Sequence, residues 1–235
     1  MVIRPSLSDI KLTRAAGIMS KPATAPAKEK EAPSVTVSAQ ELGERNVRVA
    51  SRYTGLREIR PNQDWDKPST PGRDSELAES LRAIMRPSPW EPGWAYCLAA
   101  AEGWVAVAMQ EAGMPAELVK RFRDVITPHC VTTARVLAKL DLLESYAVPG
   151  AIWLTQRGKS SNGHAGLVVA VKGATMATIE ANTSLDPSTP SKEREGDWIT
   201  NRVRSVMRNG EFSTLGFLHP QGMLDLAAGV IAAAA

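Results

Sequence analysis

Residues 163–184 read GHAGLVVAVKGATMATIEANTS, and this stretch constrains the fold more than any other part of the chain. Residues 164–171 are short, apolar and rich in β-branched side chains, as expected of a strand. Residues 175–182 form a second arm that carries Thr178, Glu180 and Asn182 at alternate positions. Side chains alternate between the two faces of a strand, so these three polar residues share one face. The stretch predicts a β-hairpin with one polar face.

The turn of this hairpin decides which residues face one another. Residues 172–174 predict a three-residue turn containing Gly, and in that register His164 lies opposite Asn182. Directly opposed residues lie on the same side of a sheet, so His164 shares a face with Asn182 and Glu180. A two-residue turn would break this register, because a slip of one residue flips the faces. An imidazole beside a carboxylate and an amide is a base with an orienting group, and it lacks only a nucleophile.

Cys97 is the candidate nucleophile. It begins a segment of about fifteen residues that is apolar nearly all round and ends at Gly113, which predicts a buried helix. The N-terminus of a helix presents unpaired N–H groups and the positive end of the helix dipole, which lower the pKa of a thiol and favour an oxyanion nearby. The alternative interpretation is a small buried cysteine in an Ala-rich helix, since free cysteine is among the most buried residue types.

Competing chemistries have weaker support in the sequence. The other histidines, His129 and His219, have no carboxylate and amide at alternate positions of an adjacent arm. One histidine with Glu180 and Asn182 is too small a ligand set for zinc, and no HExxH pattern occurs. Neither a phosphate-binding Gly-rich loop nor a GxSxG nucleophile turn is present. We therefore expect cysteine chemistry with no metal and no cofactor.

The order of the predicted elements indicates an α+β fold. Residues 38–41 form a capping box and predict a helix over 39–53. A turn-rich loop over 54–73 and several further helices come next, and antiparallel strands that follow one another as a meander complete the order. We expect a flexible basic tail over residues 1–37, a catalytic domain over 38–220 and an apolar helix or tail over 221–235.

Composition excludes several classes of protein. The net charge of +3 is too small to argue for a nucleic-acid partner. Two cysteines are too few for a disulfide scaffold, although a single bridge between Cys97 and Cys130 stays open. The N-terminal residues contain no apolar run, so we expect no Sec-type signal peptide. No apolar stretch of about 18 residues occurs, so we expect no transmembrane anchor.

Four separated motifs resemble those of the CHAP superfamily, the papain-like and NlpC-related cysteine amidohydrolases and peptidases of bacterial and phage cell-wall lysis. They are Tyr-Cys-x-Ala at residues 96–99, Pro-Gly-Ala-Ile at 149–152, Gly-His-x-Gly-Leu-Val-Val at 163–169 and Ile-Glu-x-Asn-Thr-Ser at 179–184. The resemblance covers roughly residues 52–220. It implies a papain-like fold in which Cys97 is the nucleophile, His164 the base, and Glu180 and Asn182 the groups that orient it. The chain departs from the family where Tyr96 replaces a common Trp and where residues 149–152 lack an acidic residue.

The resemblance also implies a function. The chain would be a peptidoglycan hydrolase, either an amidase or an endopeptidase, that reaches the cell wall by phage delivery, by holin release or as part of a virion. The N-terminal tail is the candidate segment for docking to a virion or to a secretion machine. Trp94 and Tyr96 in the approach to the helix, together with Gly163, are the candidate substrate contacts. Two other interpretations stay open: a non-lytic virion or baseplate component that docks through its N-terminal tail, and a papain-like amidase or deamidase toxin.

Overall fold

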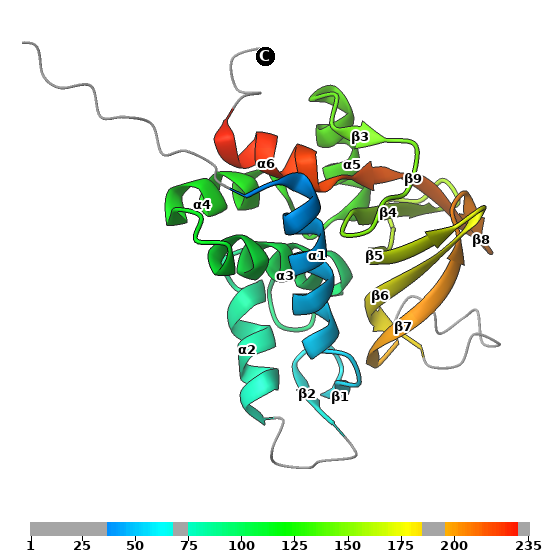
Figure 1. The fold of residues 1–235 in the computed structure, drawn as a ribbon. Coiled ribbons are helices and arrows are strands. Elements are labelled where there is room, and N and C mark those ends of the chain that lie inside the picture. The colour runs from blue at the N-terminus through cyan, green and yellow to red at the C-terminus, as the bar shows by residue number, and fades with distance from the viewer. Residues whose placement is uncertain (1–36, 68–74, 185–195, 230–235) are drawn as a thin grey trace, which may run out of the picture. The chain divides into compact units, whose positions relative to one another are not determined.

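The computed structural model describes residues 37–67, 75–184 and 196–229 (Figure 1). The predicted tail over residues 1–37 lies outside the described residues except for Val37. Val37 is buried. The compact core therefore includes one residue that the prediction assigned to the tail.

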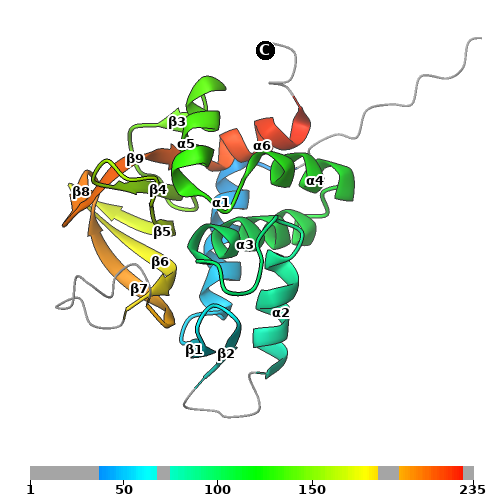
Figure 2. The ribbon, with the colours of Figure 1, turned by 180° about the vertical axis from the view of Figure 1, so that it is seen from behind.

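Six helices occur in the described part of the chain: α1 (Ala39–Arg52), α2 (Ser75–Met85), α3 (Cys97–Glu111), α4 (Ala116–Val125), α5 (Cys130–Lys139) and α6 (Pro220–Ala228). Helix α1 begins where the sequence predicts, because the Ser38 hydroxyl accepts a hydrogen bond of 3.2 Å from the Glu41 N–H. Helix α6 packs against α4 and α1 (Figures 1 and 2). The predicted separate segment over 221–235 is therefore part of the main domain up to the end of α6.

The strands form one antiparallel sheet, which confirms the α+β class. They are β1 (Arg57–Arg60), β2 (Asp64–Asp66), β3 (Leu143–Glu144), β4 (Ile152–Arg157), β5 (Ala165–Lys172), β6 (Thr175–Thr183), β7 (Trp198–Ser205), β8 (Arg208–Asn209) and β9 (Phe212–Leu218). The order is β2-β1-β7-β6-β5-β4-β9-β3, and β8 pairs with β9.

Two features of the sheet differ from the prediction. Strands β4 to β7 form the expected meander, but β9 returns to the opposite side and pairs with β4 instead of β7. Strands β1 and β2 form a hairpin inside the segment predicted to be a loop. These strands have only four and three residues, so their period-2 pattern was too short to stand out from the turn residues around them.

The hairpin of β5 and β6 has the predicted register from Leu167 and Val168 toward its His164 end, but its turn differs from the predicted one. Its turn has two residues, because Lys172 pairs with Thr175 and Gly173 adopts a positive φ of 58°. A β-bulge then places Val169 in β5 without a partner between the pairs Val168–Thr178 and Ala170–Ala177. The bulge shifts the register by one residue, which cancels the effect of the shorter turn.

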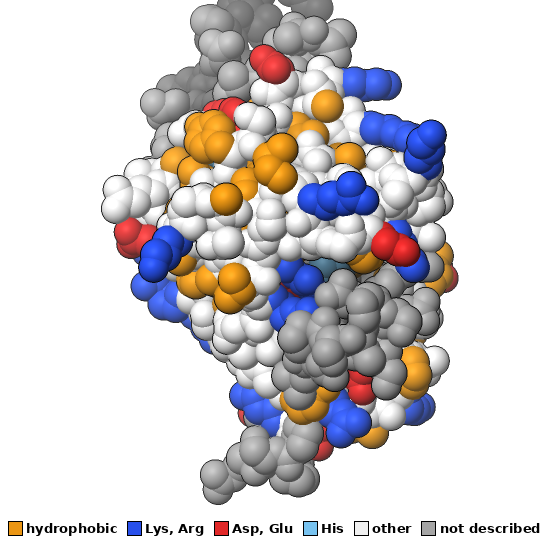
Figure 3. Space-filling model, turned by 90° about the vertical axis from the view of Figure 1, so that its right-hand side faces the viewer, with side chains coloured by type: hydrophobic (Ala, Val, Ile, Leu, Met, Phe, Trp, Pro, Cys, Tyr) orange, Lys and Arg blue, Asp and Glu red, His pale blue; other side chains and the backbone are white. Residues whose placement is uncertain are grey.

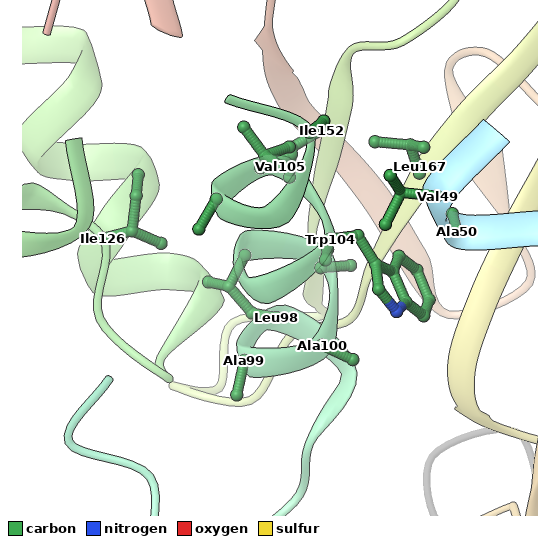
Figure 4. Packing of buried hydrophobic residues seen from close by; sticks show 14 of the residues in the cluster. Val49, Ala50, Leu98, Ala99, Ala100, Trp104, Val105, Ile126, Ile152 and Leu167 are labelled. Atoms are coloured by element: carbon green, nitrogen blue, oxygen red, sulfur yellow. The ribbon is translucent and has the colours of Figure 1, made fainter. Parts of the chain in front are cut away.

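Helix α3 occupies the centre of the main hydrophobic core (Figure 4). Trp104 points from this helix toward Val49 and Ala50 of α1 and toward Leu167 of β5, while Ile126 lies on the opposite side of the helix (Figure 4). The helix-facing side of the sheet contributes alternate residues of each strand, such as Ile179 and Ala181 of β6. The apolar surface of α3 predicted from the sequence is therefore buried on all sides, since almost the whole helix lacks solvent exposure.

The other side of the sheet carries a second, smaller cluster that contains Trp153, Val168, Met176 and Phe217. Met176, Thr178 and Glu180 of β6 point to this side, because they alternate with the helix-facing residues. Seen from the sheet side, the surface mixes basic and acidic side chains with small groups of hydrophobic ones (Figure 3). Within the described residues, none of the helices combines the length and the apolar composition needed to cross a membrane.

Candidate active site

Cys97 is the first residue of α3, as the sequence predicts, and it is buried with 4% of its surface exposed. The preceding residue, Tyr96, provides no side-chain cap to the helix. The N–H groups of the first turn of a helix have no partner within the helix, so this end attracts negative charge. The position therefore suits a thiolate and the oxyanion that forms when a thiolate attacks a carbonyl.

His164 directly precedes β5, and its backbone is fixed by Thr155 of β4. The Thr155 N–H and hydroxyl both donate to the His164 carbonyl at 2.9 Å, and the His164 N–H donates to the same hydroxyl at 3.0 Å. The His164 Nε2 lies 2.9 Å from Oε2 of Glu180, which confirms that the two residues share a face. The ring and the Cys97 thiol also interact electrostatically, since His164 lowers the pKa of Cys97 and Cys97 raises the pKa of His164.

Glu180 is held by two further side chains that the sequence analysis did not assign to the site. Arg204 of β7 donates from Nε to Oε1 at 2.8 Å and from Nη2 to Oε2 at 2.6 Å. The Thr178 hydroxyl donates to Oε1 at 2.6 Å. All three side chains are buried, with Arg204 7% exposed and the other two fully enclosed. Both carboxylate oxygens are therefore fixed, which fixes the imidazole that Oε2 contacts.

Two glycines let these side chains approach the strand. A Cβ on Gly166 would lie 2.7 Å from Cγ of Glu180, so the absence of a side chain leaves room for the glutamate over β5. A Cβ on Gly163 would lie 2.8 Å from Cβ of Cys130 and 2.2 Å from the Thr155 carbonyl oxygen. The groups that occupy the space left by these two glycines are Glu180 and Cys130.

The charges of the site reinforce one another. A hydrogen bond with Cys130 lowers the pKa of Cys97 well below its ordinary value, and His164 lowers it further against the opposing effect of burial. Burial acts to lower the pKa of His164, but Cys97 and Glu180 outweigh it and raise the pKa to about 9. Burial likewise acts to raise the pKa of Glu180, but Arg204 and His164 hold it well below its usual range. The site therefore favours a thiolate–imidazolium pair at neutral pH.

A cavity of about 290 Å³ opens directly onto the thiol. It is lined by Trp94, Ala95, Cys97, Pro128, His129, Cys130, Ser161, Asn162, Gly163 and Asn182. Trp94 is 42% exposed, and its ring lies 6.1 Å from that of His129 at the wall of the cavity. A larger hollow of about 600 Å³ lies beside α1 and the start of α6, but Cys97 and His164 do not line it. The smaller cavity is therefore the one that gives access to Cys97.

The structure thus brings most of the predicted site residues together. Trp94, Gly163 and Asn182 line the cavity, and Asn182 does so from a backbone with a positive φ of 56°. Tyr96, which the sequence analysis assigned to substrate contact, instead has no exposed surface, and its ring packs edge-on against Trp65 at 4.9 Å. Tyr96 therefore belongs to the core behind the site, because a residue that precedes a buried helix is covered by the elements packed around that helix.

Sequence reasoning missed Arg204, His129 and Cys130 as parts of the site. The sequence has no signal for Arg204, because the alternation of Arg202, Val203 and Arg204 predicts the arginines on the solvent face of a strand. The structure shows the reverse, with both arginines buried and Val203 77% exposed. For Cys130 the sequence left open only a bridge to Cys97; the structure has both as free cysteines with their Sγ atoms 4.0 Å apart, brought together by the packing of α5.

No group of three or more His, Cys, Asp or Glu side chains suited to a metal ion occurs among residues 37–67, 75–184 and 196–229. Comparisons with family models, characterised proteins and solved structures return no match to this chain.

Proposed function

We propose that the chain is a cysteine amidohydrolase that cleaves an amide bond of peptidoglycan. The observation that carries the proposal is a buried group in which the Cys97 thiol interacts electrostatically with His164, His164 bonds Glu180, and Arg204 fixes the carboxylate. A nucleophile, a base and a group that orients the base are the parts that acyl transfer requires.

We assign a role to each group from its position. Cys97, as a thiolate, attacks the carbonyl carbon of the substrate and forms a tetrahedral intermediate. His164 has its Nε2 on Glu180, which leaves its other ring nitrogen to donate a proton to the leaving amine. Water then attacks the thioester, and the imidazole takes up a proton from that water. Glu180 keeps the ring in one orientation throughout.

The oxyanion of the tetrahedral intermediate needs hydrogen-bond donors. The backbone N–H of Cys97 is one such donor, because it lies at the first residue of α3. Loss of one oxyanion donor typically raises the barrier by about 3 kcal/mol, so the helix terminus contributes to rate as well as to thiolate stability.

The substrate class rests on the four motifs that resemble the CHAP superfamily. The arrangement also supports a papain-like fold: the nucleophile begins a buried helix, and the base precedes a strand of the antiparallel sheet packed on that helix. Trp94, half exposed at the cavity, is placed to contact a sugar or peptide of the wall. We propose that the enzyme acts at the cell wall after phage, holin or virion-associated delivery.

The test is a muropeptide assay on purified peptidoglycan with the wild type, Cys97→Ala and His164→Ala. His219→Ala is the matched control, because His219 does not line the cavity at Cys97 and its Nε2 contacts the Tyr146 carbonyl. We expect both site variants to lose activity by several orders of magnitude and the control to keep the wild-type rate. Wild-type activity in either site variant contradicts the assignment.

Mass spectrometry of the released fragments identifies the bond. A new amino terminus on the peptide, with free N-acetylmuramoyl groups, indicates an amidase, and cleavage within the peptide indicates an endopeptidase. A wild-type protein whose Cys97 reacts rapidly with an alkylating agent but that releases no fragments favours an amidase or deamidase with another substrate.

A further inference from the structure

The cavity contains a second thiol that forms and breaks no bond in the proposed reaction. The Sγ atoms of Cys97 and Cys130 lie 4.0 Å apart, and both residues are free cysteines. Each begins a helix, α3 and α5 respectively. These are the only two cysteines of the chain. Two sulfur atoms in contact need to approach by only about 2 Å to reach the length of a disulfide bond.

Cys130 packs against Gly163, the residue that precedes His164. A Cβ on Gly163 would lie 2.8 Å from Cβ of Cys130, so the loop before His164 packs directly against this residue. Both thiols line the cavity of about 290 Å³, and a small oxidant that enters the cavity meets both of them. The pair therefore combines an activated thiolate with a neighbouring thiol, which is the arrangement of a redox-sensitive site.

We propose that Cys97 and Cys130 form a site of reversible oxidative modification, in which a hydroperoxide converts the two thiols to an intramolecular disulfide. Its consequence for catalysis rests on the hydrolase function proposed above, whereas its chemistry is measured without a substrate.

The reaction proceeds in two balanced steps. The Cys97 thiolate attacks one peroxide oxygen, a sulfur–oxygen bond forms, the oxygen–oxygen bond breaks, and the departing oxygen takes a proton from the His164 imidazolium. The product is a sulfenic acid on Cys97. The Cys130 sulfur then attacks the Cys97 sulfur, a sulfur–sulfur bond forms, the sulfur–oxygen bond breaks, and hydroxide leaves as water with the proton of Cys130. The two thiols lose two electrons in total, and the peroxide gains two.

The first step prepares the second. In the reduced protein, the hydrogen bond to Cys97, burial and the negative charge of Cys97 raise the pKa of Cys130 well above its ordinary value. Conversion of the thiolate to a neutral sulfenic acid removes that negative charge. Cys130 then loses its proton more easily, at the moment when its thiolate is needed as the attacking group.

The disulfide protects the nucleophile as well as blocking it. A sulfenic acid without a neighbouring thiol is oxidised further to sulfinic and sulfonic acids, which are not reversed by ordinary thiol reductants. Capture by Cys130 stops the oxidation at a stage that a thiol reductant reverses. The proposed hydrolase would therefore be inactive under oxidising conditions and regain activity on reduction.

The experiment exposes the full-length wild type to hydrogen peroxide and follows free thiols and intact mass. We expect the thiols to fall from two to zero per chain, the mass to fall by that of two hydrogen atoms, and dithiothreitol to restore both. Peptide mapping should find the linked Cys97 and Cys130 peptides, and non-reducing electrophoresis should show a monomer. A disulfide-linked dimer, or a gain of oxygen without a linked peptide, overturns the proposal.

Two variants separate the roles of the thiols. Cys130→Ala should gain two or three oxygen atoms on Cys97 under the same exposure, and dithiothreitol should not remove them. Cys97→Ser should keep the Cys130 thiol free. If Cys130→Ala recovers a free thiol as fully as the wild type does, Cys130 is not the resolving residue. These readouts distinguish a failure of the disulfide from a failure of the hydrolase, because they do not depend on substrate cleavage.

Discussion

Replacement of Arg204 by methionine tests how the site is held together. Arg204 and Glu180 form two charge-assisted hydrogen bonds of 2.8 and 2.6 Å, and both side chains are buried. The variant leaves the Glu180 carboxylate in the interior with only His164 and Thr178 as partners. Removal of one partner of a buried ion pair typically costs about 3–5 kcal/mol of unfolding free energy, because the remaining charge is left without compensation.

The assay for Arg204→Met is denaturant unfolding with thermal unfolding beside it. We expect the variant to lose about 3–5 kcal/mol of unfolding free energy, and its Tm to fall on the order of 10 °C. Arg208→Met is the matched control, since Arg208 is exposed and bonds only the Gly210 carbonyl among the contacts that the structure gives it. Surface substitutions of this kind usually change stability by about 0.5 kcal/mol or less.

A double-mutant cycle makes the test stricter. The pair Arg204→Met with Glu180→Met removes both charges, so it should be less destabilised than the sum of the two single variants. Arg204→Met should also lower kcat/KM, because the carboxylate that orients His164 loses its main anchor. A loss below about 1 kcal/mol together with wild-type activity refutes the reasoning, since Arg204 would then not be what fixes Glu180.

Three further predictions follow from the charges and contacts of the interior. The pH profile of kcat/KM should keep its plateau through neutral pH and fall on the alkaline side near the pKa of His164, about 9, because the neutral ring no longer protonates the leaving amine. A fall near the ordinary histidine pKa of 6.5 contradicts the thiolate–imidazolium pair. Gly166→Ala should push the Glu180 side chain away from the His164 ring and lower kcat, measured by steady-state kinetics, by about a hundredfold. An unchanged kcat would show that the Glu180 side chain has room to move. Burial raises the pKa of Glu102 from 4.5 to about 8 despite its ion pair with Arg123, so the contribution of Glu102 to stability is complete below pH 4.5 and is lost as the pH rises through 8. Glu102→Gln should therefore flatten the pH dependence of the unfolding free energy between these two values, by up to about 1.4 kcal/mol per pH unit. Parallel curves for the variant and the wild type refute this.

The parts of the site that the sequence predicts depend on local signals. Cys97 was found because an Ala-rich apolar segment begins there and ends at a glycine, and helix α3 begins at that residue. His164 and Glu180 were found because they lie on two adjacent arms with a short turn between them. In each case the decisive contact lies within one helix or one hairpin, where spacing along the chain determines position in space.

The parts that the sequence does not predict depend on packing between distant segments. Arg204 reaches Glu180 through the pairing of β6 with β7, and these strands are too far apart along the chain for a short turn to set their register. Cys130 reaches Cys97 because α5 packs near β4, and no periodicity in the sequence gives that distance. Strand β9 joins β4 instead of β7 for the same reason, since the meander of β4 to β7 has two edges and no local pattern says which one a later strand joins.

The β-bulge at Val169 has a consequence for how this hairpin tolerates changes in length. The alignment of His164 with Glu180 depends on the sum of two local lengths, one in the turn at Gly173 and one in the bulge. An insertion in the turn combined with the deletion of Val169 leaves the catalytic end of the hairpin unchanged, whereas either change alone turns the imidazole to the opposite side of the sheet. Single-residue insertions and deletions in this hairpin should therefore preserve the site only as compensating pairs.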